Sequence, residues 1–554
     1  MPKVLDSVEK SRFLDQKSWR SIFQDSNEKC TYYAGSGRLN SAFGSNSVQG
    51  MLRMVLEDLE PKLVWEIFEF VLSKNPRPSK KEARVRSAIK TWAVKMAKNK
   101  DNVLEILEDE IGNLLIRKAA TEGNESWPSI LLQGHCDMVC ETNRPEGFNF
   151  DSNPIPIQLS EDGKWVEAEG TTLGADNGIG IALALALLFD DTISHGPLEV
   201  LITVDEETGL VGAFGLDIDA LGIRSKLMIN IDSELLGTMT IGSAGGGDAI
   251  LKRQVSLSDE SKDWHFLHIS VSGLLGGHSG VDIHLPRGNA NVLLARILSA
   301  ISNDVTISLA EWNGGSKHNA IARESEAIVA VKNIDAAIEI LKSERKAILS
   351  YYRSDVTGAK ILEPEIEISW YDEAKRPTFS VRESKAIIAT ASALPHGPLR
   401  YSPSVEGLVE TSSNFAIIET EEELITFHLS IRSSVDEEIA ATRRSIAGIA
   451  SLGHWNLTQT PAYPGWKPEP ESPFLLFVKD IYGRVFGREV EVSAIHAGLE
   501  TGIIGAKIPG IQMVSVGPDI QNAHTPDERV RISDIPVLYR LLKSVITEIP
   551  RLDE

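Results

Sequence analysis

Hydrophobic and polar positions divide the chain into a polar N-terminal stretch and a long part with regular periodicity. Residues 1 to about 55 are rich in Ser, Asn, Gly and charged residues and show no sustained period, which predicts a poorly ordered extension. Apolar residues then recur at a spacing of three to four, at Leu63, Val64, Ile67, Phe68 and Val71. Because that spacing is typical of a buried helix face, we expect the folded part of the chain to begin there.

From Ser129 onward, short apolar runs alternate with a longer one. The runs 130–132, 198–204 and 227–231 have the length and composition of buried strands, whereas 179–189 is long enough for a helix. This alternation predicts βαβ units and a largely parallel sheet with helices on its faces. In such sheets, ligands bind beyond the carboxyl ends of the strands.

The glycine-rich stretch 241–247 interrupts this pattern. The residues that follow mix predicted strands, such as 266–271 and 327–331, with predicted helices such as 292–301, which indicates an inserted α+β domain. After the proline-rich segment 461–473, the first pattern resumes with a helix, strands near Val492 and over 511–516, and a last helix from Ile535. The predicted organisation is an extension over 1–55, a discontinuous α/β domain over 56–243 and 461–554, and an inserted domain over 244–460.

Composition narrows the classes of partner. The 554 residues are 42% hydrophobic, enough for at least two folded domains. The 56 basic and 78 acidic residues give a net charge of -22, which disfavours nucleic acid and anionic membranes as partners. The longest apolar run covers about half of the ~20 residues that a membrane span needs. Small molecules, peptides and metal ions fit this composition better than nucleic acid or a membrane does.

Cysteine usage bears on the cellular compartment. Cys30, Cys136 and Cys140 are the three cysteines, and they form no CxxC pair. A sparse, odd set of this kind gives no disulfide framework and suits a reducing compartment. The N-terminus has acidic residues where a secretory signal would have an apolar core. We therefore expect a cytoplasmic protein.

Histidines and acids cluster where the predicted strands end. His135 and Asp137 end one strand, three acids at 205–207 end another, Asp232 ends a third, Asp176 precedes the apolar helix, and His524 follows the strand 511–516. Each cluster alone has an ordinary explanation. A His-x-Asp pair is commonly a surface or capping pair, Asp176 or Asn177 could cap the helix, and three neighbouring acids could lie on a solvated turn. Five such clusters in one chain instead indicate a common site.

The residue types point to a metal site. Histidine and carboxylate together are ligands that zinc accepts, and a carboxylate two residues from a histidine can orient that ring from behind. The chain has neither His-Glu-x-x-His nor Gly-x-Ser-x-Gly, so a single-zinc protease of that kind and a lipase-type serine hydrolase are not supported. Two metal ions that share a bridging carboxylate are the expected arrangement.

The order and spacing of these clusters resemble the aminoacyl-histidine dipeptidase branch, also called Xaa-His dipeptidase or peptidase D, of the co-catalytic di-zinc peptidases related to carboxypeptidase G and the aminoacylases. The resemblance runs from about Leu59 to the C-terminus. It rests on PRPS (76–79), DEIGNL (109–114), HCD (135–137), GADNG (174–178), DEETG (205–209), GGHSG (276–280), RGNAN (287–291), ETS (410–412), HAGLE (496–500) and HTPDE (524–528).

This resemblance implies a fold, a cofactor and a set of roles. The fold is α/β, with a discontinuous catalytic domain built on a mainly parallel sheet and an inserted α+β domain that acts as lid and dimerisation domain. Two Zn²⁺ ions are expected per chain, with Mn²⁺ or Co²⁺ as substitutes. Residue by residue, the implied roles are one zinc on His135 and Asp232, the other on Glu207 and His524, Asp176 as the bridge, Asp137 orienting His135, and Glu206 as general base.

The resemblance also places substrate-binding groups on the inserted domain. His278 and Asn319 would contact the developing oxyanion or nearby peptide atoms, and Arg432 would pair with the free carboxylate of the substrate. From the sequence alone, the alternative for Arg432 is a surface salt bridge. The implied function is zinc-dependent hydrolysis of Xaa-His and other unblocked dipeptides by a cytoplasmic homodimer.

Two other functions use the same residues. An amidohydrolase of the aminoacylase type would act on N-acyl amino acids with the same metals and would not need a free substrate amine. A catalytically inactive, zinc-stabilised interaction protein is the alternative from another class. The intact Glu206 and Asp137 argue against the second, because a protein without catalysis does not need an unligated base beside its metals.

Overall fold

The computed structural model describes residues 54–100, 103–353 and 361–553. The extension predicted for residues 1–55 lies almost entirely outside the described residues. Residues 54–554 form one compact unit by their contacts, and the description below concerns this unit.

The first described elements confirm the helical pattern that begins near Leu63. Helix α1 (Lys62–Glu66) continues directly into η2 (Ile67–Ser73), a stretch of π-helix. Val64, Ile67, Phe68 and Val71 are all buried there. Helix α2 (Ala83–Asn99) follows and buries Val85, Ile89 and Ala93 at helical spacing.

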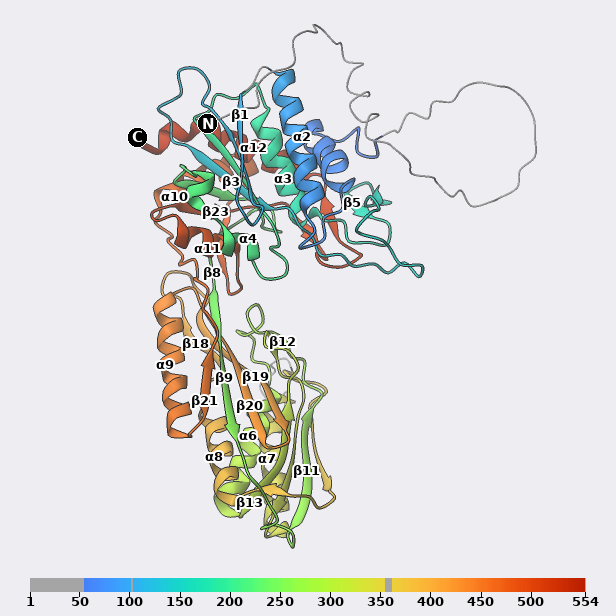
Figure 1. Cartoon of the computed structure of the whole chain (residues 1–554), viewed down its shortest axis with the longest axis vertical. Coiled ribbons are helices and arrows are strands. Elements are labelled where there is room, and N and C mark those ends of the chain that lie inside the picture. Colours follow the sequence, from blue (N-terminus) through green and yellow to red (C-terminus); the bar gives the residue numbers. More distant parts are fainter. Residues whose placement is uncertain (1–53, 101–102, 354–360, 554) are drawn as a thin grey trace, which may run out of the picture. The chain divides into compact units, whose positions relative to one another are not determined.

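We call the first sheet with its covering helices the first layer system (Figure 1). The sheet is mixed and has eight strands in the order β1-β2-β6-β3-β7-β23-β8-β22. The neighbours β6, β3, β7 and β23 pair in parallel. Strands β3 and β6 are buried over their whole length, as expected for parallel strands covered on both faces. The bounds are β1 (Leu104–Glu108), β2 (Leu114–Lys118), β3 (Ile130–His135), β6 (Leu198–Thr203), β7 (Leu227–Asn230), β8 (Thr238–Ser243), β22 (Glu491–Ile495) and β23 (Gln512–Ser515).

Helices cover both faces of this sheet. On one face, the apolar helix α3 packs against β3, η2 and α12, and α12 also contacts α10. On the other face, α4, α5 and α11 share a separate apolar cluster with Leu115, Leu131, Leu201 and Met228. The bounds are α3 (Ala175–Leu188), α4 (Val211–Gly215), α5 (Ile218–Leu221), α10 (Pro473–Phe486), α11 (Glu500–Lys507), α12 (Asp534–Glu548) and the 3-10 turn η3 (Ile549–Asp553).

A small four-stranded sheet ties the C-terminal segment to the first half of the chain. Its order is β24-β25-β5-β4, with β4 (Ile157–Leu159), β5 (Trp165–Ala168), β24 (Ile520–Gln521) and β25 (Arg529–Arg531). Pairing of β24 with β25 closes the loop 522–528, and pairing of β25 with β5 attaches it to the first half of the chain. That loop carries His524.

A nine-stranded antiparallel sheet and the helices on one of its faces form the second layer system. The order of the strands is β16-β11-β15-β13-β19-β20-β9-β21, with β18 paired to β19. Figure 1 shows β9, β19 and β20 side by side. The bounds are β9 (Gly245–Gln254), β11 (His265–Ser272), β13 (Ile307–Gly314), β15 (Ser325–Val331), β16 (Glu367–Asp372), β18 (Gly397–Tyr401), β19 (Val409–Glu421), β20 (Leu424–Ser433) and β21 (Asn456–Gln459). Two short pairs accompany it, namely β10 (Leu257–Ser258) with β17 (Thr378–Phe379) and β12 (Gly277–His278) with β14 (Ala320–Ile321).

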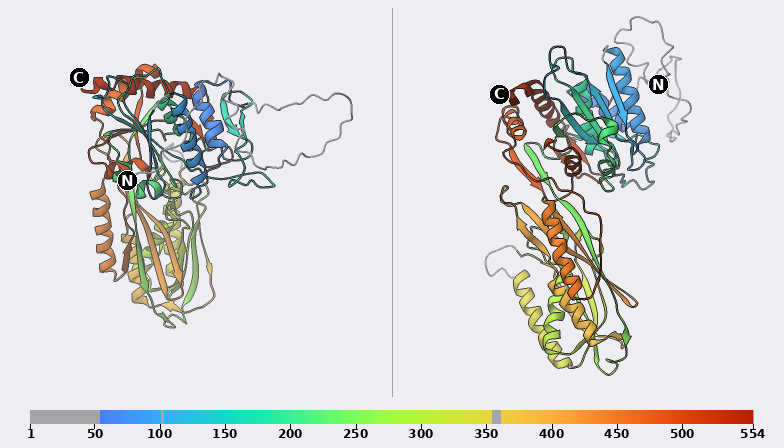
Figure 2. Two further views of the ribbon diagram at one scale, coloured as in Figure 1. Left: turned by 45° about the horizontal axis from the view of Figure 1, so that its top comes forward. Right: turned by 60° about the vertical axis from the view of Figure 1, so that its left-hand side comes forward.

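Four helices cover one face of this second sheet. They are α6 (Ala290–Asp304), α7 (Ile334–Tyr352), α8 (Val381–Ala393) and α9 (Asp436–Leu452), and Figure 2 shows them in yellow to orange against the strands. All four share one apolar cluster with alternate strand residues such as Leu251, Phe427 and Leu429. The residues between these, including Asp248, His428 and Arg432, therefore lie on the opposite face of the sheet.

The predicted fold class is confirmed: a mainly parallel sheet is followed by an antiparallel α+β part, and later strands return to the first sheet. The exact domain boundaries at 243 and 460 remain predictions. Among residues 54–100, 103–353 and 361–553, no helix combines the length and apolarity needed to cross a bilayer.

Candidate functional site

The topology of the first sheet brings the predicted side chains to one edge. His135 is the last residue of β3, Asp205–Glu207 directly follow the parallel neighbour β6, and Asp232 follows β7 on the other side. Because parallel strands end at the same edge, these residues converge there. Asp176 at the start of α3 and His524 in the loop between β24 and β25 complete the group.

Asp176 lies at the centre of the cluster, and each of its carboxylate oxygens faces a different histidine. Its Oδ1 is 3.0 Å from Nε2 of His135, and its Oδ2 is 3.1 Å from Nε2 of His524. The alternative that Asp176 or Asn177 caps the helix finds no support, because within the described residues neither side chain accepts an N–H of α3, and both residues have non-helical backbone angles.

A further carboxylate joins each histidine. Asp232 Oδ1 is 3.4 Å from Nε2 of His135, and Glu207 Oε2 is 3.0 Å from Nε2 of His524. The result is two three-residue groups that share Asp176, and the potential ligand atoms of each group lie within 4.8 Å of one another. The structure thus brings together all five side chains that the sequence predicts as metal ligands: His135, Asp176, Glu207, Asp232 and His524.

Asp137 contacts residues at the ends of two neighbouring strands, β3 and β6. Its Oδ1 is 3.4 Å from Nδ1 of His135, the contact expected for a carboxylate that orients this ring. The same carboxylate accepts the backbone N–H groups of Glu206 at 3.0 Å and Glu207 at 3.2 Å, and the Ser79 hydroxyl at 2.8 Å. It therefore holds the backbone of the two acids and lies beside the ring of His135.

The chain turns sharply after β6, which lets both acids reach the cluster. Asp205 has a positive φ of 48°, and the backbone N–H groups of Gly209 and Leu210 donate to the Glu206 carbonyl. In a straight strand Glu206 and Glu207 would point to opposite sides. Here the carboxylates of both lie within 4.8 Å of a ring nitrogen of His135.

Glu528 was not assigned a role from the sequence, although the structure gives it one. Its carboxylate is buried and accepts the backbone N–H groups of Leu173, Gly174, Ala175 and Asp176 at 2.7 to 3.1 Å. These are the free donors at the start of α3, where a helix binds an anion favourably. Glu528 therefore fixes the backbone that carries Asp176. Its position four residues after His524 was the only signal in the sequence.

Arg77 is a second positioning residue that the sequence did not reveal. It is almost fully buried, and its guanidinium donates to the backbone carbonyls of Cys136, Asp137 and Gly174. These contacts join the loop after β3 to the start of α3. A buried arginine in the segment 76–79 links the backbones of His135 and Asp176.

The cluster carries strongly perturbed pKa values. Burial raises the pKa of Asp232 to about 6 although His135 opposes this, and burial together with the charges of Asp232 and Glu500 raises the pKa of Glu206 well above its usual value. Hydrogen bonds to Asp176 and Glu207 raise the pKa of His524 to about 11. The crowded carboxylates and the histidines with raised pKa values indicate a site suited to binding positive charge.

Glu500 lies behind this cluster at the start of α11. Gln133 Nε2 and the Thr203 hydroxyl each donate to its Oε2 at 2.6 Å, whereas its Oε1 is buried without a hydrogen-bond partner. Burial raises the pKa of Glu500 to about 7. The sequence left open whether Glu500 contacts substrate or supports the fold, and these contacts tie it to β3 and β6.

His278 and Asn319 lie together on the second layer system. His278 pairs with Ala320 across β12 and β14, and the Ser279 N–H donates to the Asn319 carbonyl. Nδ1 of His278 accepts the N–H groups of Gly280 and Val281 at 3.2 and 3.1 Å, so Nε2 carries the hydrogen of the neutral ring. Burial, together with the charge of Arg432, lowers the pKa of His278, which keeps it a neutral donor.

Arg432 is buried, with 9% of its surface exposed. Its Nη1 donates to the Tyr463 hydroxyl at 3.3 Å, and its Nε has no hydrogen-bond partner. No carboxylate within the described residues forms an ion pair with it, so the alternative of a surface salt bridge is wrong. His278, Asn319 and Arg432 make no hydrogen bond or ion pair to the His135 cluster within the part of the chain that the structure describes.

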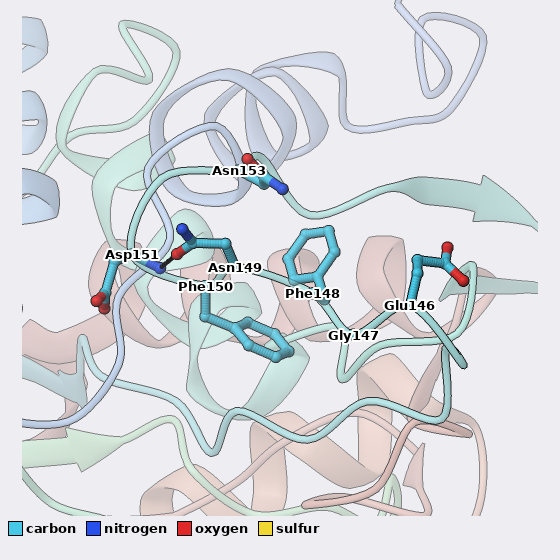
Figure 3. A pocket seen from close by; sticks show the side chains of 7 residues that line it. All are labelled: Glu146, Gly147, Phe148, Asn149, Phe150, Asp151 and Asn153. Carbon is cyan, nitrogen blue, oxygen red and sulfur yellow. Dashed lines mark hydrogen bonds between the residues drawn. The ribbon is translucent and has the colours of Figure 1, made fainter. Parts of the chain in front are cut away.

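A surface hollow of about 600 Å³ lies in a different region. It is formed by loop 146–153, where the rings of Phe148 and Phe150 pack edge to face (Figure 3). None of its lining residues belongs to the metal-type cluster or to the group around Arg432.

Comparison with known proteins gives consistent matches over most of the chain. Residues 131–548 match the model of peptidase family M20/M25/M40. The chain is 35% identical to the cytosol non-specific dipeptidase of Escherichia coli (strain K12) over 498 residues, which cover 89% of this chain and 99% of that protein.

Solved structures agree with this. The crystal structure of aminoacylhistidine dipeptidase from Vibrio alginolyticus matches with a TM-score of 0.81 and 35% identity, over 89% of this chain and 97% of that one. An aminopeptidase PepT from Bacillus cereus matches with a TM-score of 0.50 and 16% identity, over 89% and 99% of the two chains. At that identity the second match supports only the fold.

Proposed function

The chain belongs to peptidase family M20/M25/M40, and from that membership we propose that it is a cytoplasmic dipeptidase that uses two zinc ions. The family resemblance predicted from the motifs is confirmed, and with it a metal-dependent peptidase activity. The number and identity of the ions, the residue roles and the preferred dipeptides are proposals.

We assign the two ions to the two groups that share Asp176. His135 and Asp232 would hold one ion, Glu207 and His524 would hold the other, and Asp176 would be the ligand that both groups share. The donor set fits zinc, which accepts imidazole and carboxylate ligands. Asp232 Oδ1 and Glu207 Oε1 are buried and lack hydrogen-bond partners, and buried carboxylate oxygens of this kind are costly unless a cation satisfies them.

When bound, such a pair of ions supplies an acidic water and polarises the peptide carbonyl. Glu206 is the proposed general base: it takes the proton of the attacking water and delivers it to the leaving amine nitrogen. Glu207 does not serve this purpose because its carboxylate is engaged with His524. Asp137 keeps the two acids in place through their backbone N–H groups.

The proposed substrate contacts come from the second layer system. The Nε2–H of His278 donates to the developing oxyanion, and Asn319 contacts the same peptide group. Arg432 binds the free carboxylate of the substrate, because a buried guanidinium without an acidic partner is suited to a carboxylate ligand. Because Arg432 is expected to hold a free C-terminal carboxylate, we expect short peptides to be preferred over proteins.

The observation that carries this proposal is the arrangement around Asp176, whose two oxygens face His135 and His524 at 3.0 and 3.1 Å. Cytoplasmic location is consistent with the sparse cysteines, and the similar Escherichia coli protein is named a cytosol dipeptidase. We also propose a homodimer formed through the second layer system. A particle of single-chain mass in light scattering at assay concentration would contradict the homodimer.

A substrate panel tests the activity against its alternatives. Xaa-His and ordinary unblocked dipeptides are compared with N-acetyl amino acids at matched zinc content. We expect hydrolysis of the dipeptides and turnover of N-acetyl amino acids at least a hundredfold lower. Preference for the N-acetyl compounds would identify an aminoacylase-type amidohydrolase, and no turnover of either class by zinc-loaded protein would identify an inactive protein.

A further inference from the structure

A second group of potential metal ligands lies on the antiparallel sheet, on the face opposite its four helices. Asp248 on β9 is paired with Ser430 on β20, and His428 lies two residues before Ser430 on the same face. His318, in the loop before β14, reaches this face and completes the group. None of the three residues has a role in the proposed dipeptidase site.

The distances within the group suit a single ion. Oδ2 of Asp248 is 3.0 Å from Nε2 of His428 and 3.4 Å from Nδ1 of His318. Zinc bonds of about 2.0 to 2.1 Å in tetrahedral geometry place neighbouring ligand atoms about 3.3 Å apart. The two histidine rings lie nearly parallel, with an interplanar angle of 16°.

One donor of the group is buried and lacks a hydrogen bond. Nε2 of His428 lies 3.0 Å from Oδ2 of Asp248 without meeting the geometry of a hydrogen bond to it. A ring nitrogen and a carboxylate oxygen that are adjacent but not bonded to each other can both be directed at a third atom.

The backbones that carry the group are firmly held. The carbonyl of Asp248 accepts the backbone N–H of Thr460 at 3.3 Å, and its own N–H donates to the Thr460 hydroxyl at 2.9 Å. Nδ2 of Asn414 donates to the carbonyls of His318 and Ala320 at 3.4 and 2.8 Å. The site is therefore built from a rigid strand pair and an anchored loop, although the His318 side chain is 54% exposed and gives an ion access from solvent.

We propose that Asp248, His318 and His428 bind a divalent transition-metal ion, separate from the two ions at Asp176. Two imidazoles and one carboxylate match the ligand preference of zinc and similar ions. The ion would fasten the loop of His318 to β9 and β20. Because Asn319 follows directly, the ion would also steady one of the proposed substrate contacts.

Metal counting on the full-length chain tests this proposal. Chelator-treated protein is dialysed against buffered Zn²⁺, and bound zinc is measured per chain by mass spectrometry. We expect the His318→Ala/His428→Gln double variant to bind one ion fewer than the unsubstituted chain. His318→Ala alone, which removes only a half-exposed side chain, should also lose this ion at the same Zn²⁺ concentration.

Two further variants keep the outcome clear. Asp176→Ala disables the proposed catalytic pair, and in that background one ion should remain and be lost when His318→Ala is added. His265→Ala removes another exposed histidine of the same sheet and should leave the count unchanged. Equal zinc counts with and without the double substitution, or a remaining ion in Asp176→Ala protein that persists after His318→Ala, would overturn the proposal. Retention of the catalytic pair by Asp176→Ala would instead overturn the assignment of the bridge.

Discussion

Glu206 and Glu207 are neighbours in the chain, and their surroundings give them different tasks. Glu207 Oε2 lies 3.0 Å from Nε2 of His524, whereas Glu206 forms no ion pair within the described residues. Burial and the negative charges around Glu206 raise its pKa well above the usual value. These different surroundings support the proposal that Glu207 is a metal ligand and Glu206 the general base.

The substitution Glu206→Gln separates these tasks. It preserves the side-chain shape and removes the proton acceptor, so turnover should fall by roughly 10²- to 10⁴-fold, the range typical of a lost general base. Both zinc ions and near-normal substrate binding should remain. Kinetics and metal content of the same preparation check this. Glu207→Gln is the matched control and should lose metal; a reversal of the two outcomes would show that the roles are exchanged.

Arg432 is expected to recognise the free carboxylate of the substrate. Arg432→Ala should lower kcat/KM for unblocked dipeptides by at least tenfold, since a charge-assisted hydrogen bond contributes about 1.5 to 3 kcal/mol. The same dipeptides amidated at the C-terminus should be affected much less. Equal losses on both substrate series would assign Arg432 a structural role.

At the residue scale, the sequence was sufficient to select the side chains that meet at Asp176, because each follows a predicted strand or precedes the apolar helix. It was not sufficient for Glu528 and Arg77. Both act through backbone atoms of distant segments, and such contacts leave no periodic or spacing signal. Arg432 is similar: its burial without an acidic partner depends on how β20 packs, which its local sequence does not specify.

Among the elements, helix α3 is the one on which the site depends most. It is buried along nearly its whole length, and its start is fixed by the Glu528 carboxylate through four N–H groups. The position of Asp176 therefore depends on how the start of α3 is held. A change at Glu528 should alter metal binding without touching a metal ligand.

Glu528→Gln replaces one acceptor oxygen with an amide NH₂ that cannot accept the α3 donors. Zinc affinity at the Asp176 site should fall by about 10- to 100-fold, the range typical of groups that orient ligands. Competition with a chromophoric chelator measures this. Asp527→Asn changes the exposed neighbouring acid and serves as control. Unchanged affinity in Glu528→Gln protein would mean that the position of Asp176 does not depend on this carboxylate.

The contact between β19 and the loop before α11 predicts a pH dependence of stability. His496 is buried and forms a 2.7 Å hydrogen bond with the Ser412 hydroxyl. Burial, together with the charge of Arg432, lowers the pKa of His496 from 6.5 to about 3. The unfolded chain therefore binds this proton more readily, so the contribution of His496 is complete above about pH 6.5 and declines as pH falls towards 3.

At pH 5 this decline amounts to at most about 2 kcal/mol, from ~1.4 kcal/mol per pH unit. His496→Gln retains a hydrogen-bonding side chain and does not titrate. Denaturant midpoints at pH 7.5 and pH 5 should therefore differ less in the variant than in the unsubstituted chain. An identical pH-dependent loss in both proteins would show that His496 does not contribute.

Sequence periodicity located most elements but not their details. The spacing from Leu63 to Val71 predicted one helix, and the structure has α1 followed by the π-helical η2. The glycines at 245–247 marked the change of pattern. In the structure they begin β9, and a Cβ on Gly245 would lie 2.4 Å from backbone atoms of Tyr463 and Gly465. That close approach involves residues far apart in the sequence, so only the fold reveals it.

For the whole molecule, the discontinuous order of strands has a functional consequence. Segments near residue 135, 205, 232 and 524 belong to different parts of the chain, and the parallel core of the first sheet brings them to one edge. The residues that would recognise substrate lie on the second sheet. The proposed mechanism therefore uses side chains from both layer systems.

The central claim is that this chain hydrolyses dipeptides only with metal ions held around Asp176. The direct measurement is dipeptide turnover by chelator-treated protein before and after addition of Zn²⁺, with bound metal determined on the same samples. We predict no turnover in the metal-free chain and recovery as the zinc content reaches two or more ions per chain. Full turnover in metal-free protein, or no turnover of any dipeptide by the zinc-loaded chain, would contradict the account.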